Sequence, residues 1–129
     1  MKFTGTIKHM LFSTWCMAGE DILAFDEWMT QGKILKLDAY CGEIFPNTYA
    51  KEYALLQSVF KKHDCGRICI FKNHSKIFAI NGEKISVGIE TSANINTNPR
   101  TENGCITVGY EMYEFYKEYF DGINSFVKD

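Results

Sequence analysis

The stretch that decides the fold is residues 73–103, NHSKIFAINGEKISVGIETSANINTNPRTEN. Two apolar runs flank Asn81-Gly82, a dipeptide typical of the two-residue turn of a β-hairpin. In the second run, apolar and polar residues alternate from Ile85 to Glu90, so the two kinds face opposite sides of a strand. The stretch therefore predicts a hairpin with strands over residues 74–80 and 84–91.

The segments on either side of this hairpin extend the pattern in both directions. Apolar, β-prone runs predict further strands over residues 9–15, 34–41, 67–72 and 105–108. Three helices are expected: one from Gly19 that Gly32 stops, one capped by Asn47 or Thr48, and one over residues 110–127. In the last helix, the residues available for a core face are Met112, Phe115, Tyr116, Tyr119, Ile123 and Phe126.

The resulting order is β-α-β-α-β-β-β-β-α. Strands that alternate with helices predict an α/β fold with parallel pairing, and the hairpin adds antiparallel pairing. We therefore expect a single domain over residues 1–129, with a mixed, mostly parallel sheet flanked by helices on both faces. The sequence leaves open whether these residues are one domain of a longer protein.

Composition narrows the class of partner. The formal net charge is −2 and the isoelectric point is near 5.9, which excludes a generally basic polyanion binder. A nucleic acid would have to be held by a local basic cluster. No apolar run approaches the roughly 20 residues that span a bilayer, and the N-terminus does not have the layout of a signal peptide. A cytoplasmic location is therefore expected. The five cysteines, an odd count, are expected to be reduced.

The residues best suited to chemistry lie in and after the hairpin. His74 and Lys76 are two apart on an expected strand, so they project from the same face. An imidazole beside an ammonium suits a phosphate group, because the ammonium attracts the anion and the imidazole attacks or moves protons. Ser92 and Asn94 add a hydroxyl and an amide donor, and Glu102 is available to fix the tautomer of His74.

These elements together resemble a known signature. His74-x-Lys76, a hairpin of this length, Ser92-x-Asn94 and a downstream Glu102 are similar to the HKD motif of the phospholipase D superfamily. The stretch looks like the small single-motif members that are common in bacteria and phages. The resemblance implies a phospholipase D-like domain.

The resemblance also implies roles for the catalytic residues. His74 would attack phosphorus to form a phosphohistidine, or would act as the acid partner in that reaction. Lys76 would bind a non-bridging oxygen, and Glu102 would orient His74. The scheme is a metal-independent phosphodiesterase reaction and needs no cofactor.

The remaining site residues would hold the substrate. By the resemblance, Asn94 binds phosphoryl oxygens, Ser92 supports that cradle, and Asn73 lies within the motif. Arg100 is expected to join a local basic rim, although solvated strand ends are an equally simple explanation for this charge. DNA or RNA is a more natural substrate than lipid, because lipases of this superfamily are generally larger and carry two motifs.

A single motif predicts a homodimer. The implied two-step mechanism uses two histidines, one on each side of phosphorus. Neither His9 nor His63 begins a second His-x-Lys motif in this chain. We therefore expect a second copy of the chain to supply the other histidine, with both His74 side chains near a twofold axis.

One position departs from the family pattern. The motif has an aspartate five residues after the lysine, whereas this chain has Asn81. This difference keeps a second hypothesis open, a catalytically degenerate domain that binds nucleic acid or a protein partner. A zinc site built from His63, Cys65, Cys69 and His74 is a weaker alternative, because zinc sites usually pair their cysteines more closely.

Overall fold

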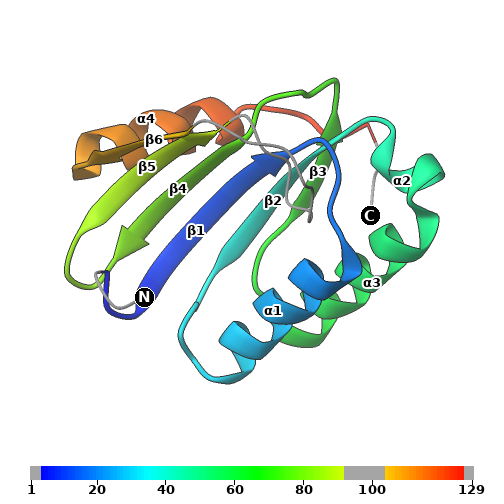
Figure 1. Cartoon of the computed structure of the whole chain (residues 1–129), viewed down its shortest axis with the longest axis horizontal. Coiled ribbons are helices and arrows are strands. Elements are labelled where there is room, and N and C mark those ends of the chain that lie inside the picture. The colour runs from blue at the N-terminus through cyan, green and yellow to red at the C-terminus, as the bar shows by residue number, and fades with distance from the viewer. Residues whose placement is uncertain (1–3, 92–103, 127–129) are drawn as a thin grey trace.

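The computed structural model describes residues 4–91 and 104–126, which form one six-stranded sheet with helices packed against it (Figure 1). The strand order across the sheet is β3-β2-β1-β4-β5-β6. The strands are β1 (Ile7–Thr14), β2 (Leu37–Gly42), β3 (Ile68–Phe71), β4 (Ile77–Gly82), β5 (Ser86–Thr91) and β6 (Gly104–Val108). The helices are α1 (Gly19–Thr30), α2 (Phe45–Thr48), α3 (Ala50–His63) and α4 (Tyr110–Asp121).

The sheet is mixed, as predicted, but it is not mostly parallel. β1 pairs with β2, and β2 with β3, in parallel, whereas the other three pairings are antiparallel. Only the first three strands are joined through helices, which parallel neighbours require. The connection from β3 to β4 is short and stays at one edge of the sheet, so β4 must return antiparallel to its predecessors.

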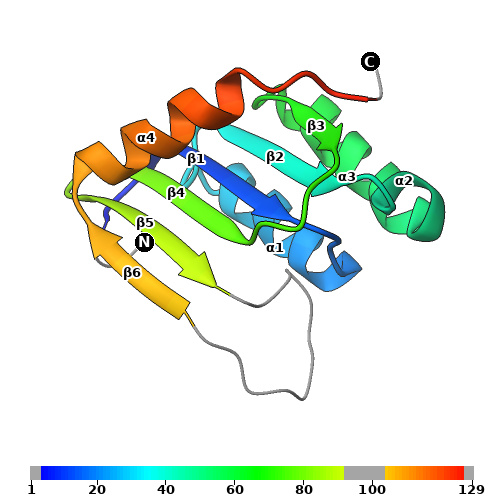
Figure 2. The ribbon, with the colours of Figure 1, turned by 90° about the horizontal axis from the view of Figure 1, so that it is seen from above.

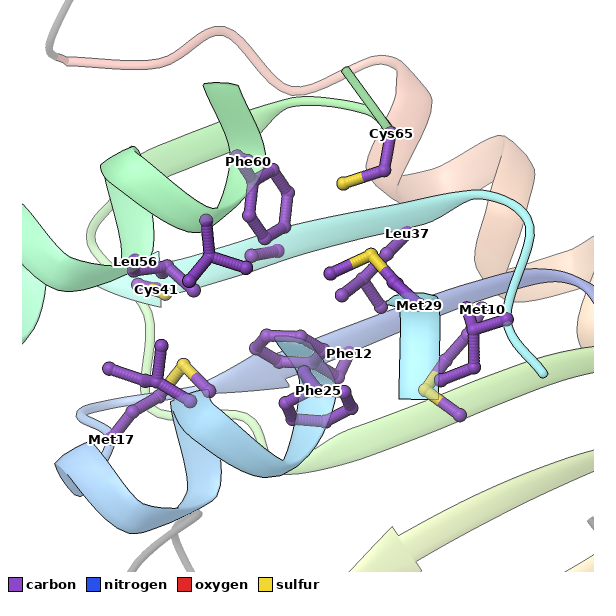
Figure 3. Close-up of a cluster of buried hydrophobic side chains, with 14 of the residues drawn as sticks. Met10, Phe12, Met17, Phe25, Met29, Leu37, Cys41, Leu56, Phe60 and Cys65 are labelled. Carbon is purple, nitrogen blue, oxygen red and sulfur yellow. The ribbon is translucent and has the colours of Figure 1, made fainter. Parts of the chain in front are cut away.

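Helices cover both faces of the sheet, as the sequence predicted. Figure 2 shows α4 on one side and α1, α2 and α3 on the other. Beneath α1 and α3, a core cluster includes Phe12, Phe25, Leu37 and Leu56, each at most 4% exposed (Figure 3). Because neighbouring residues of β1 point to opposite faces, Leu11 packs instead into the cluster under α4.

The aromatic residues through which α4 packs match the expected set only in part: of the three that are buried, Tyr116 was expected. Tyr113, Tyr116 and Phe120 are buried at helical spacing, whereas Phe115 and Tyr119 are about 60% exposed. All of these positions are aromatic, so the sequence pattern did not distinguish the inner face from the outer one. The buried face of α4 is selected by the sheet, because Leu11, Tyr40 and Ala79 form the surface against which α4 packs.

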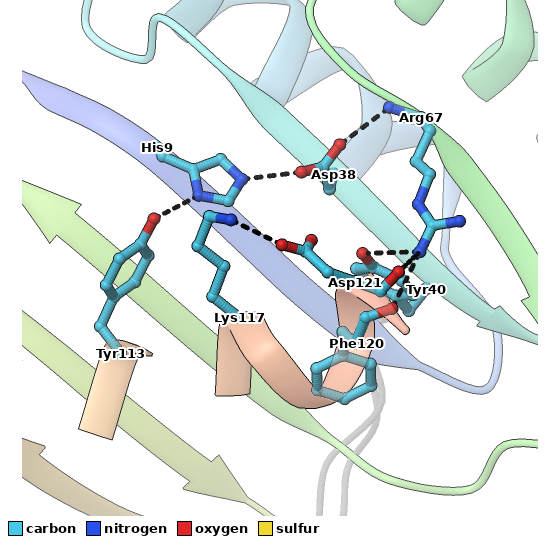
Figure 4. Close-up of polar contacts among 8 residues, drawn as sticks. All are labelled: His9, Asp38, Tyr40, Arg67, Tyr113, Lys117, Phe120 and Asp121. Atoms are coloured by element: carbon cyan, nitrogen blue, oxygen red, sulfur yellow. Dashed lines mark hydrogen bonds and ion pairs between the residues drawn. The ribbon is translucent and has the colours of Figure 1, made fainter. Parts of the chain in front are cut away.

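α4 also ends at Asp121, six residues before the predicted end. The Arg67 guanidinium donates hydrogen bonds to the carbonyl oxygens of Phe120 (2.8 Å) and Ile123 (3.0 Å), as Figure 4 shows for Phe120. The chain then runs alongside β3, where the Phe126 N–H donates to the Ile70 carbonyl oxygen (2.6 Å). These distant partners replace the bonds that another helical turn would have made.

A buried polar network attaches α4 to the sheet at the edge opposite the site described below. His9 Nε2 donates to the Asp38 carboxylate (2.7 Å), and His9 Nδ1 hydrogen-bonds with the Tyr113 hydroxyl (2.6 Å; Figure 4). Burial alone would raise the pKa of Asp38, but hydrogen bonds from His9 and from the Arg67 N–H outweigh it and lower that pKa. Burial raises the pKa of Tyr113 to about 12.

The hairpin turn lies two residues later than predicted. β4 continues through Asn81-Gly82, and the chain reverses at Glu83 and Lys84. The N–H groups of Glu83 and Lys84 donate to the carbonyl oxygens of Thr6 and Thr4, each at 2.8 Å. A distant segment therefore extends the hairpin beyond its local turn signal.

The predicted cap of the second helix was also wrong. Asn47 and Thr48 lie inside the short helix α2, and α3 begins after Tyr49 without a side-chain cap. α2 leads almost directly into α3, so the chain is already helical shortly before α3 begins. No helix in residues 4–91 and 104–126 combines the length and the apolar character that crossing a membrane requires.

Candidate active site

One edge of the sheet collects the chain segments that the sequence marked for chemistry. The parallel strands β1, β2 and β3 end at this edge, and the antiparallel strand β4 begins there, where Ile77 pairs with Ser13. β5 ends at the same edge and β6 begins there, because Thr91 pairs with Gly104. Loops at the carboxyl ends of parallel strands are where open α/β sheets bind ligands. We call this edge the site edge.

The His74-Ser75-Lys76 segment is a loop, not the start of a strand, so our argument from strand parity was wrong. β4 begins only at Ile77. Asn73 Oδ1 accepts hydrogen bonds from the Ser75 N–H (2.9 Å) and the Ser75 hydroxyl (2.6 Å). Such local bonds from an asparagine side chain compete with the ladder of a sheet and form a turn.

Asn73 attaches this loop to the interior of the protein. Its side-chain amide is buried and donates to Ser13 Oγ (2.8 Å) and to the Tyr40 carbonyl oxygen (3.3 Å). Ser13 Oγ also hydrogen-bonds with Ser75 Oγ (2.6 Å). Because both ends of the Asn73 amide are used internally, this geometry does not support the predicted contact with substrate. Asn73 positions the loop instead.

The His74 ring projects from this loop toward solvent. It is exposed, and it stacks on the Trp15 indole with a centroid separation of 4.8 Å and an angle of 29° between the planes. The Lys76 ammonium donates to the His74 carbonyl oxygen (2.9 Å). An accessible imidazole and a primary ammonium therefore lie on the same four-residue turn, although they do not follow strand periodicity.

Glu43 is a neighbour that the sequence reasoning missed. Its carboxylate accepts a hydrogen bond from the Asn73 N–H (3.1 Å). A hydrogen bond from its own N–H, the bond from Asn73, and the electrostatic influence of the nearby His74 and Lys72 hold the pKa of Glu43 below its ordinary value. The signal for Glu43 was its place directly after β2, at the carboxyl edge of a parallel strand.

Four predicted site residues lie outside the described residues: Ser92, Asn94, Arg100 and Glu102. Their convergence with His74 stays a prediction. The residues that flank them are described, and both lie at the site edge. The Thr91 N–H donates to the Lys76 carbonyl oxygen (3.0 Å), and Thr91 pairs with Gly104. Segment 92–103 therefore begins after Thr91, beside Lys76, and ends where β6 begins, next to β5.

Asn81, where the sequence departs from the family motif, lies at the opposite end of β4. It pairs with His9 and Ser86, and its side-chain oxygen accepts a hydrogen bond from Ser86 Oγ (2.9 Å). Asn81 lies five positions along the strand from Lys76, a span of about 16 Å. The missing carboxylate would thus have belonged to the hairpin end, away from His74.

The zinc alternative finds no support in the described part of the chain. Residues 4–91 and 104–126 contain no group of three His, Cys, Asp or Glu side chains that could hold a metal ion. His63 instead hydrogen-bonds with Asp26 (2.6 Å), and the Cys69 thiol donates to the Ile123 carbonyl oxygen (3.8 Å).

Comparisons with known proteins agree with this architecture. No family model matches the chain, and no curated protein matches it. A solved structure does: a polyphosphate kinase from Porphyromonas gingivalis superposes with a TM-score of 0.62 and 13% sequence identity. The fold is phospholipase D-like. The match covers 95% of this chain but only 23% of the kinase chain.

This likeness confirms the predicted α/β fold class. At 13% identity it shows the fold alone, so it does not select a nuclease branch.

Proposed function

We propose that this chain is a metal-independent phosphodiesterase that acts on nucleic acid through His74, at a site shared by two copies of the chain. The observation that carries the proposal is that the His74 loop and both ends of segment 92–103 lie at the site edge. His74 and Lys76 share one loop there, and Thr91 and Gly104 flank the segment with the other motif residues beside it.

The chemistry follows from the two exposed groups. An imidazole nitrogen of His74 attacks phosphorus, a P–N bond forms, and the P–O bond to the leaving alcohol breaks. The leaving oxygen takes a proton from the His74 imidazolium of the second copy. Water then attacks the phosphohistidine and gives a proton to the neutral imidazole of the second copy. The P–N bond breaks, so the phosphomonoester is released and both histidines return to their starting forms. Lys76 moves from the His74 carbonyl to a non-bridging oxygen and balances the charge there.

A nucleic acid is the substrate class that the charge distribution supports. The overall charge is −2, yet Lys72 and Lys76 lie on either side of His74, and Arg100 follows in the flanked segment. A phosphodiester group needs only such a local cluster.

A binding domain without turnover is the second candidate function. Asn81 in place of the motif aspartate favours it. However, Asn81 lies about 16 Å along β4 from Lys76, so a change there need not alter the site. Asn81→Asp should accordingly leave turnover unchanged, and a large gain in turnover would support the degenerate domain instead.

The test is a phosphodiesterase assay in excess EDTA, with bis(p-nitrophenyl) phosphate and with single- and double-stranded DNA. We expect turnover in the native protein and a loss of several orders of magnitude in His74→Asn. Lys76→Ala should also lose activity, whereas Lys84→Ala, at the hairpin end, is the matched control and should not. DNA binding that requires Lys76 but gives no product would select the binding domain. Activity restored only by added Mg²⁺ or Zn²⁺ would contradict the mechanism.

A further inference from the structure

Trp15 is held at the site edge by contacts with the end of β2. It directly follows β1, and its carbonyl oxygen accepts a hydrogen bond from the Gly42 N–H (3.3 Å) at the end of β2. A Cβ atom added at Gly42 would lie 2.3 Å from Cδ1 of the indole. The absence of a side chain at residue 42 therefore lets the indole lie directly against the β2 backbone.

The indole supports one face of the His74 ring. The two rings are stacked at 4.8 Å, from two loops far apart in sequence. The rest of the loop is fixed by Asn73 and Ser75, but these bonds hold the backbone and do not restrict the exposed imidazole. Lys76 contacts the His74 carbonyl oxygen and leaves the ring alone. The stack on Trp15, in contrast, acts on the ring itself.

We propose that Trp15 is a positioning residue: its indole holds the His74 imidazole in a stacked orientation, so that one ring face is covered and the other stays open. The consequence for turnover rests on the proposed function, whereas the placement of the ring does not. A nucleophile held in its reactive orientation avoids an entropic cost in each turnover. Leaving the ring free to rotate should lower kcat more than it raises KM.

Proton NMR tests the placement without any substrate. The chain has only three histidines, so the imidazole C–H signals are few, and His74→Asn assigns those of His74. Stacking on an indole should shift these signals upfield. Trp15→Leu should abolish the shift, and Trp15→Phe should retain part of it. The signals of His9 and His63 report folding, and Trp28→Phe, at the other tryptophan, is the matched control that should leave His74 unchanged.

Kinetics then connect the placement to turnover. In Trp15→Leu we expect kcat to fall roughly 10- to 100-fold with little change in KM, and Trp15→Phe to recover most of it. Unshifted His74 signals in the native protein, or signals that Trp15→Leu leaves in place, would overturn the proposal whatever the activity. If Trp15→Leu fails to fold, Trp15→Phe decides, because a shift equal to that of the native protein would also overturn it. A native protein with shifted signals and no turnover would refute the proposed function and leave the placement standing.

Discussion

Asn73 is 4% exposed, and its amide makes four side-chain hydrogen bonds that join β1, β2 and the His74 loop. The bonds to Ser13 and to the Tyr40 carbonyl are buried, where lost partners are not replaced freely by water. The sequence analysis assigned the residue to the substrate. Two of its four bonds instead go to residues 33 and 60 positions away, and the other two go to Ser75.

Removing this amide should cost stability as well as activity. Asn73→Ala leaves several buried polar groups without partners, so we expect the free energy of unfolding to fall by about 1–3 kcal/mol. Urea denaturation followed by circular dichroism would measure the loss. Asn81→Ala is a suitable control, because its side chain accepts one hydrogen bond at a partly buried position and should cost less. Equal effects of the two substitutions would contradict the role assigned to Asn73.

At the scale of elements, α4 depends on residues outside itself. Its inner face carries Tyr113, which reaches His9 and through it Asp38. Its last turn is closed by Arg67, whose own N–H donates to Asp38 (2.9 Å). One buried carboxylate therefore connects β1, β2, the start of β3 and α4.

This connection predicts a specific dependence of stability on pH. The pKa of Asp38 is lowered in the folded protein, so its carboxylate stabilises the fold above the pKa of the unfolded chain. That contribution is lost as the pH falls through the lower, folded pKa, in the range below about pH 4. We expect Asp38→Asn to be less stable than the native protein at neutral pH, and the difference to shrink in acid.

Urea unfolding at a series of pH values from 2 to 7 would measure this difference. Asp121→Asn is the matched control, because Asp121 forms an exposed ion pair with Lys117 and should contribute little at any pH. A difference between Asp38→Asn and the native protein that is constant over the whole range would show that the Asp38 charge does not stabilise α4.

At the scale of the whole molecule, the fold limits how two copies can share a site. β6 is an edge strand whose five residues are all exposed, including Ile106 and Val108 at about two-thirds exposure. Pairing of β6 with its copy would be antiparallel about a twofold axis, which places the two site edges at opposite ends of the extended sheet. A dimer with both His74 rings near its axis must therefore use another surface.

We expect a homodimer in which both His74 rings lie near the twofold axis and the β6 edges are not paired. Light scattering should give twice the chain mass of 14.8 kDa, and Ile106→Lys, which spoils the β6 edge, should leave that mass unchanged. Mixed dimers with one native chain and one His74→Asn chain should lose most of their activity, because each reaction uses both histidines. A monomer at high concentration, or a dimer that Ile106→Lys dissociates, would rule out the shared site.

The sequence by itself determined the order of the elements, and it predicted a kind of chemistry that stays a prediction. Helical and strand periodicities are local, so they located all six strands and the starts of the long helices to within three residues. The alternation from Ile85 to Glu90 was correct because Val87 packs inward while Glu90 does not. The pairing of His74 with Lys76 and the hairpin that follows were likewise readable from the chain alone. The predicted roles of Ser92, Asn94, Arg100 and Glu102 are still predictions.

Only the tertiary structure decided how these pieces meet. Thr4 and Thr6 moved the hairpin turn, Ser13 and Tyr40 kept the His74 loop out of β4, and Arg67 ended α4. The return of β4 beside β1 made the sheet mainly antiparallel and brought Trp15 and Glu43 to His74. Each outcome depends on hydrogen bonds or packing between residues distant in sequence, and no local pattern specifies such a partner.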